Sequence, residues 1–292
     1  MKEGRLIKGI GGFYYVYIDG LIYECKARGI FRKKKITPSI GDFVRIDVID
    51  EEKKLGVLEE ILDRKNEMIR PPVSNIDQAF IVFSFINPDI NTMLLDRFTV
   101  LAESKGLDVV ICLNKTDLVK DEILIKELNE IYKNSGYKII MTSTKENNGL
   151  EEIKNLLHSK TSVFAGPSGV GKSSILKILT NRELEIGDVS QKTGRGKHTT
   201  RHAELIRINS DGWVVDTPGF SSLDLGEIDS EELSDFFPEF REYMTECRFV
   251  SCSHVNEPDC MVKEALEEGK IALSRYENYK TFLKEIKESR RY

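Results

Sequence analysis

The sequence predicts a multidomain protein: a small β-barrel, then an α/β domain with a mostly parallel sheet, then a helical region that binds a metal. Three observations support this fold class. Short aromatic and β-branched runs crowd residues 1–68, apolar strands alternate with amphipathic helices over 76–226, and residues 227–292 combine acidic helical stretches with clustered cysteines and a histidine. We therefore expect three domains with these boundaries.

The composition is that of a folded globular protein. Of 292 residues, 40% are hydrophobic and 31% are charged, and the longest apolar runs, such as AFIVFSFI, are only strand-sized. A membrane span needs about 20 apolar residues, and the opening MKEGRLIKGIGG contains no apolar signal core. We expect a cytoplasmic protein with no membrane partner.

Several short strands are expected in residues 1–68. FYYVYIDGLIYECKARG consists of two aromatic and β-branched runs joined at Asp19-Gly20, which is a hairpin signal. GDFVRIDVID and KLGVLEEIL add further strands, and so many strands in so few residues predict a small barrel. EMIRPPVSN has paired prolines and no periodicity, so it is the predicted linker.

Strands and helices alternate from residue 76 onward. The predicted strands are QAFIVFSF, LDVVICLN, YKIIMTS, SVFAG and a pair around an Asp211-Gly212 turn. The predicted helices are LLDRFTVLAESKG, EILIKELNEIYKNSG, GLEEIKNLLHSK and GKSSILKILT. Near-continuous apolar strands that alternate with helices indicate a mostly parallel sheet.

The stretch GPSGVGKSS is a phosphate-binding loop. It fits G-x-x-x-x-G-K-[ST] in full and lies between a predicted strand and a predicted helix, which is the context that the motif requires. Its glycines let backbone N–H groups approach phosphate oxygens, and the helix N-terminus adds positive potential. We expect Lys172 to reach the β- and γ-phosphates and Ser173 to ligate Mg²⁺. The predicted nucleotide-binding residues are Gly166, Pro167, Ser168, Gly169, Val170, Gly171, Lys172, Ser173 and Ser174.

A second motif, Asn114-Lys115-Thr116-Asp117, ends another predicted strand and has the residues of a guanine-reading loop. Asp117 can accept hydrogen bonds from N1 and N2 of guanine, a donor pair that adenine lacks. Asn114 can bond the O6/N7 edge of the base, and the stem of Lys115 can pack on the ring. Alone, this tetrapeptide could be a helix cap, with Asp117 capping the next helix. Beside a phosphate loop, it predicts GTP and GDP as ligands.

Two further loops complete the predicted nucleotide site. In DTPGF, Asp216 suits water-mediated binding of Mg²⁺ and the Gly219 N–H can bond the γ-phosphate, although an ordinary Thr-Pro-Gly turn is the alternative. In TSTKENNGL, backbone N–H groups around Ser143 and Thr144 could meet guanine O6, with a capped loop as the alternative.

The segment TGRGKHTTRHAE is glycine-rich and basic and lies between the phosphate loop and DTPGF. We expect it to be mobile, with Thr199 or Thr200 closing on Mg²⁺ when a γ-phosphate is present. Ras-type GTPases place a water-orienting Gln directly after the switch-two glycine, but here that position is Phe220. His198 is therefore a candidate for positioning the attacking water, with a threonine of this segment or a group of a bound partner as alternatives.

The order of these motifs differs from that of the usual GTPase, because the base loop precedes the phosphate loop. Ligands bind outside the carboxyl ends of the strands in an open parallel sheet. Chain order does not decide which strands are neighbours. The sequence therefore predicts one nucleotide site in a circularly permuted GTPase domain.

A cluster of metal-ligating residues occupies 14 positions: Cys247, Cys252, His254 and Cys260. Zinc accepts three thiolates and one imidazole tetrahedrally, and such a closed site is structural. The spacing is not that of a common zinc finger, so reduced free cysteines are the alternative. Because this region is short and acidic, we expect little core in it beyond one zinc ion. The remaining cysteines, Cys25 and Cys112, are expected to be buried thiols.

The predicted barrel carries positive charge. Residues 1–70 contain 15 Lys or Arg and 12 Asp or Glu, a net charge of +3, against −5 for the whole chain. A predicted loop concentrates five cations: Arg28, Arg32, Lys33, Lys34 and Lys35. Aromatic residues lie nearby in the sequence: Phe13, Tyr14, Tyr15, Tyr17 and Tyr23. Such barrels suit RNA, but a solvated loop and core packing are alternatives, since alternation turns about half of the aromatics inward.

With this motif order, a barrel in front and a Cys/His cluster behind, the chain resembles the RsgA family, also called YjeQ, of ribosome small subunit-dependent GTPases. The resemblance covers essentially the whole chain and rests on NKTD, GPSGVGKSS, GRGKHTTR, DTPGF and the cysteine cluster. STK in the second base loop only loosely matches the commoner Ser-Ala-Lys. The resemblance implies an OB-fold barrel, a permuted GTPase core, a zinc-binding C-terminal domain and a catalytic role for His198.

The resemblance also implies an activity and partners. We expect hydrolysis of GTP to GDP and phosphate with magnesium, stimulated by the small ribosomal subunit late in its maturation. Ribosomal RNA is the expected partner of the barrel, and we expect a monomer. The alternative is an rRNA-binding assembly chaperone whose nucleotide state sets its affinity while hydrolysis is incidental. An ATPase with a zinc tail is disfavoured by Asn114 and Asp117.

Overall fold

A computed structural model describes residues 1–33, 36–68, 72–180, 203–209, 211–216, 220 and 223–290. The chain forms two compact units. The first contains Met1–Gln78, Ile153–Phe164 and Ser173–Ser221, and the second contains Ala79–Glu152, Ala165–Lys172 and Ser222–Tyr292. Each unit therefore joins segments that are far apart in the sequence, and the three predicted domain boundaries stay a prediction.

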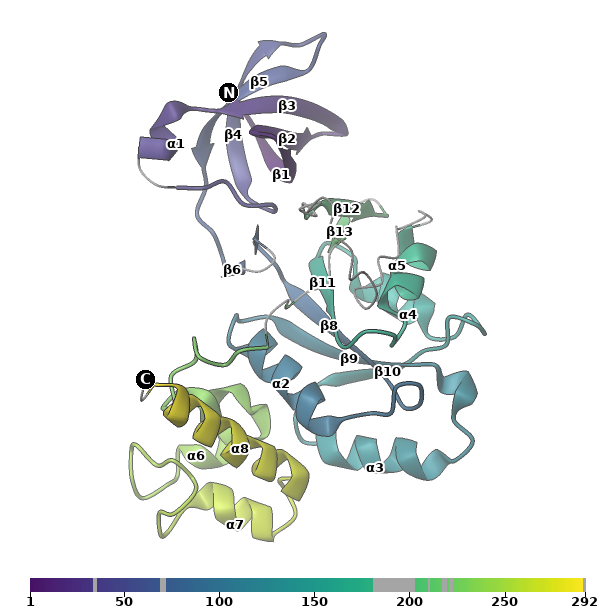
Figure 1. Cartoon of the computed structure of the whole chain (residues 1–292), viewed down its shortest axis with the longest axis vertical. Coiled ribbons are helices and arrows are strands. Elements are labelled where there is room, and N and C mark those ends of the chain that lie inside the picture. The colour runs from purple at the N-terminus through teal and green to yellow at the C-terminus, as the bar shows by residue number, and fades with distance from the viewer. Residues whose placement is uncertain are drawn as a thin grey trace, which may run out of the picture. The chain divides into compact units, whose positions relative to one another are not determined.

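The first unit begins with a closed barrel in the strand order β1-β2-β3-β5-β4 (Figure 1). Its strands are β1 (Lys2–Ile10), β2 (Phe13–Ile18), β3 (Leu21–Ala27), β4 (Phe43–Asp50) and β5 (Leu55–Ile61). β3 and β5 run parallel and the other neighbours antiparallel, which is the arrangement of an OB-like barrel. The predicted turn is confirmed, since Asp19 and Gly20 have φ of 46° and 87°.

Side-chain alternation along these strands fills the barrel. Its fully buried apolar residues include Leu6, Val16, Cys25, Val44, Ile46 and Leu58. Of the five aromatic residues singled out in the sequence, only Tyr23 is buried. The other four are half-buried, and Tyr14 lies on the same face of β2 as the buried Val16 and Ile18, so the expectation that about half of the five face inward stays a prediction.

The basic segment after β3 was expected to be a loop, but it contains a short helix, α1 (Gly29–Lys33). Arg28, directly before it, pairs with Glu59 at 2.9 Å. Lys34 and Lys35 lie outside the described residues.

The predicted linker contains a two-stranded ribbon. β6 (Glu67–Met68) pairs antiparallel with β7 (Val73–Ser74). The Ser74 hydroxyl donates to the buried Asp42 carboxylate at 2.6 Å. Gly41, at φ 97°, permits this approach, because a Cβ there would lie 2.1 Å from the Ser74 carbonyl oxygen. This part of the segment is therefore fixed to the barrel.

Three further strands belong mainly to the first unit. They are β11 (Thr161–Ala165), β12 (Leu205–Ile208) and β13 (Gly212–Val215). β13 runs parallel to β11 and antiparallel to β12, and the predicted turn at Asp211-Gly212 joins β12 to β13. Helices α4 (Leu150–Leu156) and α5 (Lys172–Thr180) flank β11 in the chain.

The second unit contains strands in the order β10-β9-β8, with β9 and β10 parallel. Its strands and first helices are β8 (Gln78–Ser84), α2 (Thr92–Glu103), β9 (Asp108–Asn114), α3 (Glu122–Tyr132) and β10 (Lys138–Met141). All seven residues of β8 are buried, as expected for a strand of a mostly parallel sheet that is covered on both faces.

The rest of the second unit is helical. Its elements are η2 (Leu233–Phe236), η3 (Pro238–Phe240), α6 (Arg241–Met244), α7 (Met261–Glu267) and α8 (Leu273–Ser289). An aromatic core holds them together: Phe237, Phe240, Tyr276, Tyr279 and Phe282. The expectation of little core in this region is therefore wrong, because acidic surface residues dominate the composition but not the interior. No helix in the described part of the chain is long and apolar enough to cross a membrane.

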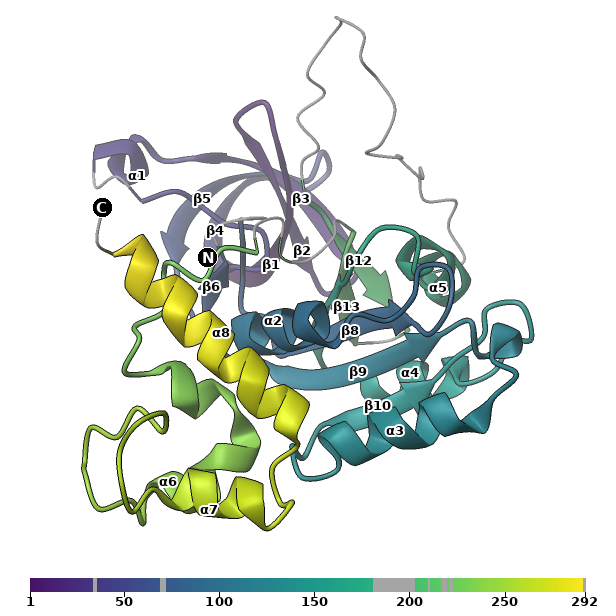
Figure 2. The same ribbon diagram turned by 60° about the horizontal axis from the view of Figure 1, so that its bottom comes forward.

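A buried ion network attaches α8 to α2, and the two helices lie side by side (Figure 2). Arg275 is 0% exposed, donates to Asp96 of α2 at 2.8 Å, and donates twice to Glu239 at 2.6 and 2.9 Å. Asp96 also accepts from Tyr132 of α3 at 2.5 Å and from Asn278 at 2.6 Å. Burial alone would lower the pKa of Arg275, but the two carboxylates raise it well above its usual value. Removing one partner from such a network typically costs about 3–5 kcal/mol.

Candidate nucleotide site and metal cluster

The phosphate loop follows β11, and α5 begins directly after it at Lys172, as the motif predicts. Gly166, Gly169 and Gly171 have φ of 140°, 80° and 101°. A Cβ at Gly166 would lie 2.0 Å from the carbonyl oxygen of Val82 in β8. Glycine is needed at this position because the loop passes directly over the backbone of that strand.

The Lys172 side chain lies over its own loop. Its ammonium group donates to the carbonyl oxygens of Gly166 at 2.8 Å and Pro167 at 2.6 Å. Burial lowers the pKa of Lys172 to about 8. Phosphate oxygens would be stronger acceptors than these neutral carbonyls, and their charge would favour the protonated amine.

Asn114 joins the base loop to the phosphate loop. Its Nδ2 donates to the carbonyl oxygen of Val170 at 2.8 Å, and its Oδ1 accepts from the Thr142 hydroxyl at 3.2 Å. The residue is only 1% exposed. A Cβ at Gly171 would lie 2.1 Å from Nδ2, so the glycine also makes room for this contact. Asn114 thus connects three loops, and its predicted contact with the base stays a prediction.

Asp117 lies in a short 3-10 helix, η1 (Thr116–Leu118), directly after β9. The alternative in which Asp117 caps the next helix is wrong, because Asp121 is the N-cap of α3 and its side chain accepts from the backbone two residues later. Lys115 has a left-handed backbone and donates its ammonium group to the carbonyl of Asn87. The base loop is therefore a separate structure and not part of the helix.

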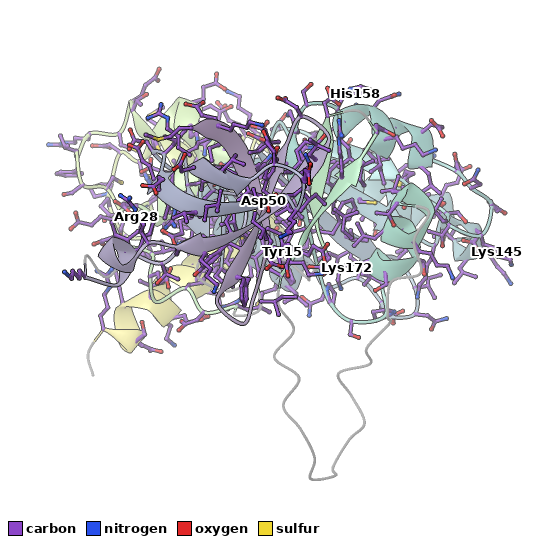
Figure 3. All side chains as sticks on the ribbon, turned by 90° about the horizontal axis from the view of Figure 1, so that it is seen from above. Tyr15, Arg28, Asp50, Lys145, His158 and Lys172 are labelled. Carbon is purple, nitrogen blue, oxygen red and sulfur yellow. The ribbon has the colours of Figure 1, made fainter. Side chains whose placement is uncertain are left out.

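The second base loop supports the first. The Ser143 hydroxyl donates to Oδ1 of Asp117 at 2.7 Å, whereas the Ser143 N–H donates to the carbonyl of Asn148 at 3.2 Å. Ser143 therefore orients the Asp117 carboxylate, a role that its sequence context did not indicate. Lys145, labelled in Figure 3, lies 4.0 Å from the same carboxylate with its side chain 80% exposed. The role predicted for Thr144 stays a prediction.

The structure thus brings both base loops and residues 166–172 of the phosphate loop together in the second unit, whereas Ser173 and Ser174 belong to the first. At the start of α5, Ser173 is half-buried and Ser174 is exposed. Four predicted residues lie outside the described part of the chain: His198, Thr199, Thr200 and Gly219.

Asp216 belongs to the first unit and directly follows β13. Its Oδ1 accepts from the N–H of Glu204 at 2.8 Å, and its own N–H donates to the carbonyl of Glu204 at 3.0 Å. Burial raises the pKa of Asp216, and the bond from the Glu204 N–H opposes that rise. The carboxylate therefore has a fixed direction, set by the residue that precedes β12.

The barrel contacts the β12–β13 pair within the first unit. Lys8 of β1 forms an isolated antiparallel bridge with Glu204 and an ion pair of 2.7 Å with its carboxylate. Tyr17 of β2 packs edge-on against Trp213 of β13, with 5.1 Å between ring centroids. One half-buried aromatic that the sequence offered for RNA stacking, Tyr17, is therefore used in this contact. The Lys26 ammonium group lies 5.1 Å from the centre of the Phe13 ring. Tyr15 lies on the same strand as Phe13 (Figure 3).

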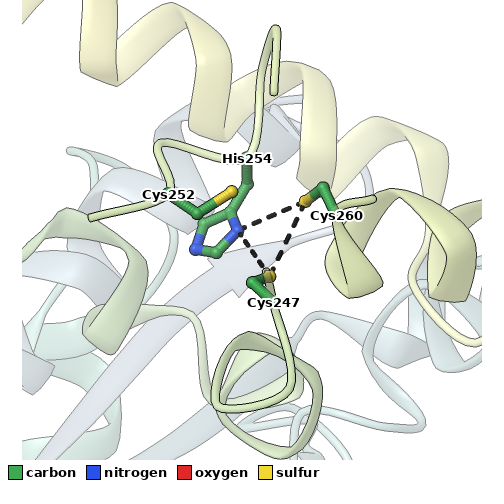
Figure 4. A group of neighbouring side chains, drawn as sticks. All are labelled: Cys247, Cys252, His254 and Cys260. Carbon is green, nitrogen blue, oxygen red and sulfur yellow. Dashed lines mark hydrogen bonds between the residues drawn. The ribbon is translucent and has the colours of Figure 1, made fainter. Parts of the chain in front are cut away.

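The four predicted metal ligands come together after α6 (Figure 4). Their ligand atoms all lie within 4.8 Å of one another. Cys247 and Cys260 sulfurs are 3.9 Å apart, and Nδ1 of His254 lies 3.6 and 3.4 Å from them. A tetrahedral zinc ion with bonds of about 2.3 Å would hold its ligands about 3.8 Å apart. Cys247, Cys252, His254 and Cys260 could therefore hold one metal ion.

The loop that carries these ligands is organised by Glu257, which the sequence did not single out. Its carboxylate accepts from the N–H and hydroxyl of Ser253 at 3.0 and 2.7 Å and from the N–H groups of Val255 and Asn256 at 3.1 Å each. Burial would raise the pKa of Glu257, but these hydrogen bonds hold it at about 2. Two tyrosines of α8 complete the support: Tyr276 donates to the carbonyl of His254, and Tyr279 to that of Ser253.

Cys25 and Cys112 are buried apolar thiols, as predicted. Both are 0% exposed, and burial raises the pKa of Cys25 to about 11 and that of Cys112 to about 12.

Comparison with known proteins decides the family. The family model described as RsgA GTPase matches residues 61–226, and the family model described as RsgA N-terminal domain matches residues 3–57. The chain belongs to the RsgA GTPase family. The resemblance proposed from the sequence is therefore confirmed, together with its OB-like barrel and GTPase domain.

Relatives in this family extend over the whole chain. A small ribosomal subunit biogenesis GTPase RsgA of Alkaliphilus metalliredigens is 53% identical over 100% of both chains, and that of Agathobacter rectalis is 51% identical over 99% of both. Among solved structures, YloQ, described as a circularly permuted GTPase, is 43% identical with a TM-score of 0.86 over 99% of this chain and 96% of that one. YjeQ from Thermotoga maritima is 39% identical, with a TM-score of 0.86 over 98% of both. These likenesses confirm the predicted circular permutation.

Proposed function

We propose that this RsgA-family GTPase binds the small ribosomal subunit and hydrolyses GTP to GDP and phosphate late in the maturation of that subunit. The observation that carries the proposal is the hydrogen bond from Asn114 to the Val170 carbonyl, which connects a complete base loop to a complete phosphate loop. Sequence identity of 53% and 51% to small ribosomal subunit biogenesis GTPases, over essentially the full length, supports the small ribosomal subunit as the partner. The site of action is the cytoplasm, and the working form is a monomer.

In this proposal, separate roles fall to the predicted site residues Asp117, Ser143, Lys172, Ser173 and Asp216. Asp117, oriented by Ser143, accepts the guanine donors, and Lys172 moves from its carbonyl partners to the phosphates. Oxygen ligands suit Mg²⁺, and the Ser173 hydroxyl and the Asp216 carboxylate are the groups that would hold it. When bound, Mg²⁺ neutralises charge that develops on the phosphates.

The metal of the Cys/His cluster is proposed to be one structural zinc ion. The observed ligand separations match a tetrahedral site, and three thiolates with one imidazole are a zinc set. Protein purified without chelator should contain one equivalent of zinc by elemental analysis. Cys252→Ser should remove it while leaving GTP binding within about twofold of the original. An absence of zinc in the unmodified protein would exclude this assignment.

His198 is proposed to position the attacking water, because Phe220 occupies the place of the water-orienting glutamine. His198→Ala should lower subunit-stimulated turnover at least about tenfold while leaving GTP affinity almost unchanged. Stimulated single-turnover hydrolysis at the original rate would assign the role to Thr199, to Thr200 or to a ribosomal group.

The barrel is proposed to contact ribosomal RNA. Phe13 and Lys26 offer a ring beside a cation on its surface, and Tyr15 lies on the same strand. Base stacking on such rings and phosphate contacts to such cations are common in RNA-binding barrels.

Two measurements test the main proposal. Co-sedimentation with small subunits should be stronger with a non-hydrolysable GTP analogue than with GDP, and small subunits should raise GTP turnover at least about tenfold. Asp117→Asn should lose both effects with GTP and regain them with xanthosine triphosphate, which ties both to this nucleotide site. Nucleotide-dependent binding with unchanged turnover would favour the chaperone with incidental hydrolysis. Equal binding to small subunits with GDP and with the GTP analogue would contradict both functions.

A further inference from the structure

One residue of the first unit, Glu204, contacts both the barrel and Asp216. Its carboxylate pairs with the Lys8 ammonium group at 2.7 Å, and the two side chains are only 34% and 28% exposed. Its backbone forms two hydrogen bonds with Asp216, one to the carboxylate at 2.8 Å and one from the N–H at 3.0 Å. A displacement of Glu204 would therefore change the direction of the Asp216 carboxylate.

Further side chains pack where the barrel contacts β12 and β13, next to the Lys8–Glu204 ion pair. Trp213 is 8% exposed, and its ring lies 5.1 Å from the Tyr17 ring and 5.8 Å from the Arg5 guanidinium group. Arg207 of β12 donates to the Tyr17 hydroxyl and lies 4.9 Å from its ring. These residues give the barrel a fixed position against β12 and β13, so the Lys8 ion pair is not an isolated surface contact.

The ion pair explains why Lys8 matters for Asp216. Without Lys8, the Glu204 carboxylate would lose its partner at 2.7 Å and would be free to rotate. Because the backbone N–H of Glu204 holds the Asp216 carboxylate at 2.8 Å, movement of Glu204 would disturb a carboxylate that has to stay oriented to bind a cation.

We propose that Lys8 of the barrel is a positioning residue for Asp216 in GTP hydrolysis. It holds Glu204 in place, and Glu204 in turn holds the carboxylate that we assign to Mg²⁺. The proposal rests on that assignment. It gives the barrel a direct influence on Asp216 within the first unit, so a partner that displaces Lys8 would change the affinity of this carboxylate for Mg²⁺.

The test replaces Lys8 and measures the Mg²⁺ requirement. Lys8→Met should raise the Mg²⁺ concentration for half-maximal GTP hydrolysis about three- to tenfold, with turnover restored at saturating Mg²⁺. It should raise by a similar factor the Mg²⁺ concentration that slows dissociation of a fluorescent non-hydrolysable GTP analogue. Lys8→Arg, and the double exchange Lys8→Glu with Glu204→Lys, should restore most of both. The matched control is Lys53→Met, which removes a lysine paired at 3.6 Å with Asp50 and 75% exposed in the turn after β4, and it should change neither.

Two further measurements separate the possible outcomes. Trp213 is the only tryptophan in the chain, so acrylamide quenching of its fluorescence reports whether the barrel contact survives in each variant. Unchanged Mg²⁺ dependence in Lys8→Met would overturn the proposal, and so would a change that the double exchange fails to reverse. Asp216→Asn tests the underlying assignment: if that variant leaves the Mg²⁺ dependence unchanged, the proposed role of Asp216 is wrong, and the role of Lys8 is wrong with it.

Discussion

The nucleotide loops and the metal-ligating loop are held in shape by different means. In the nucleotide loops, backbone passes close to backbone, as at Gly166 over Val82, and no side chain fits between them. In the metal-ligating loop, one carboxylate, that of Glu257, collects four hydrogen bonds from the backbone and side chain of its neighbours. The difference predicts how each region responds to substitution: abruptly where a Cβ would collide, and gradually where hydrogen bonds are removed.

The two regions also differ in how far apart their parts lie in the chain. Asn114 and Val170 are 56 residues apart, and the strand ends bring them together. Cys247 and Cys260 are 13 residues apart, and a single loop brings them together. A change in the strands should therefore reach the nucleotide site, whereas the metal cluster should respond mainly to changes in its own loop and in α8.

The largest effect is expected from Gly166→Ala. A methyl group 2.0 Å from the Val82 carbonyl oxygen cannot be accommodated unless the phosphate loop or β8 moves. GDP affinity, measured by titration of a fluorescent analogue, should fall at least about 1,000-fold. Gly106→Ala is the matched control, because Gly106 also has a positive φ, of 66°, but a Cβ there would meet nothing within 4 Å. Near-original affinity in Gly166→Ala would show that the loop tolerates displacement.

Asp117→Asn should weaken GTP binding by roughly 1,000-fold and improve binding of xanthosine nucleotides, because it swaps an acceptor for a donor at one edge of the base. Ser143→Ala removes the 2.7 Å bond that orients Asp117, and with it the bond at 3.1 Å that the hydroxyl accepts from the Glu146 N–H, so it should cost about tenfold without changing the preferred base. Competition between GTP and XTP measures both. Retained preference for GTP in Asp117→Asn would mean that this motif does not bind the base.

Glu257→Gln keeps the size of the side chain and removes the charge that binds four donors. We expect metal affinity to fall about 10- to 100-fold, as is usual for groups that support metal ligands, while GDP affinity stays unchanged. Competition with a chromophoric chelator measures the metal affinity. The matched control is Glu268→Gln, whose carboxylate pairs with Lys270 on the surface. Equal metal affinity in both variants would show that the ligands alone shape the loop.

The smallest effect is a pH dependence of nucleotide binding. Burial lowers the pKa of Lys172 to about 8, and phosphates would raise it, so binding should take up a proton above about pH 8. GDP affinity should therefore fall about tenfold between about pH 7 and about pH 9. Guanosine lacks phosphates and is the control, because the titration of guanine itself affects both ligands equally. A constant ratio of the two affinities across this range would contradict the role of Lys172.

Local sequence patterns predicted the phosphate loop, the base loop, the metal ligands and ten of the thirteen strands in the described part of the chain, because each depends on spacing within a few residues. β1, β6 and β7 were not predicted. They did not predict contacts that only the tertiary structure creates. Ser143 orients Asp117 across 26 residues, and Lys8 meets Glu204 across 196. The core of the C-terminal region was missed for a related reason: net charge describes its surface, whereas Phe237, Phe240 and Phe282 decide its interior.

The Arg275 network also determines the order in which parts of the chain can complete their folding during synthesis. The barrel can close once β5 has left the ribosome that makes it, because all of its strands lie within the first 61 residues. Asp96 of the second unit must wait for Arg275, which is made 179 residues later. At about 5–20 residues per second, that delay is roughly 10 to 35 s. During it, Asp96 has Tyr132 as a hydrogen-bond partner but lacks the charge of Arg275, and α8 does not yet cover α2, so the newly made second unit would benefit from a chaperone.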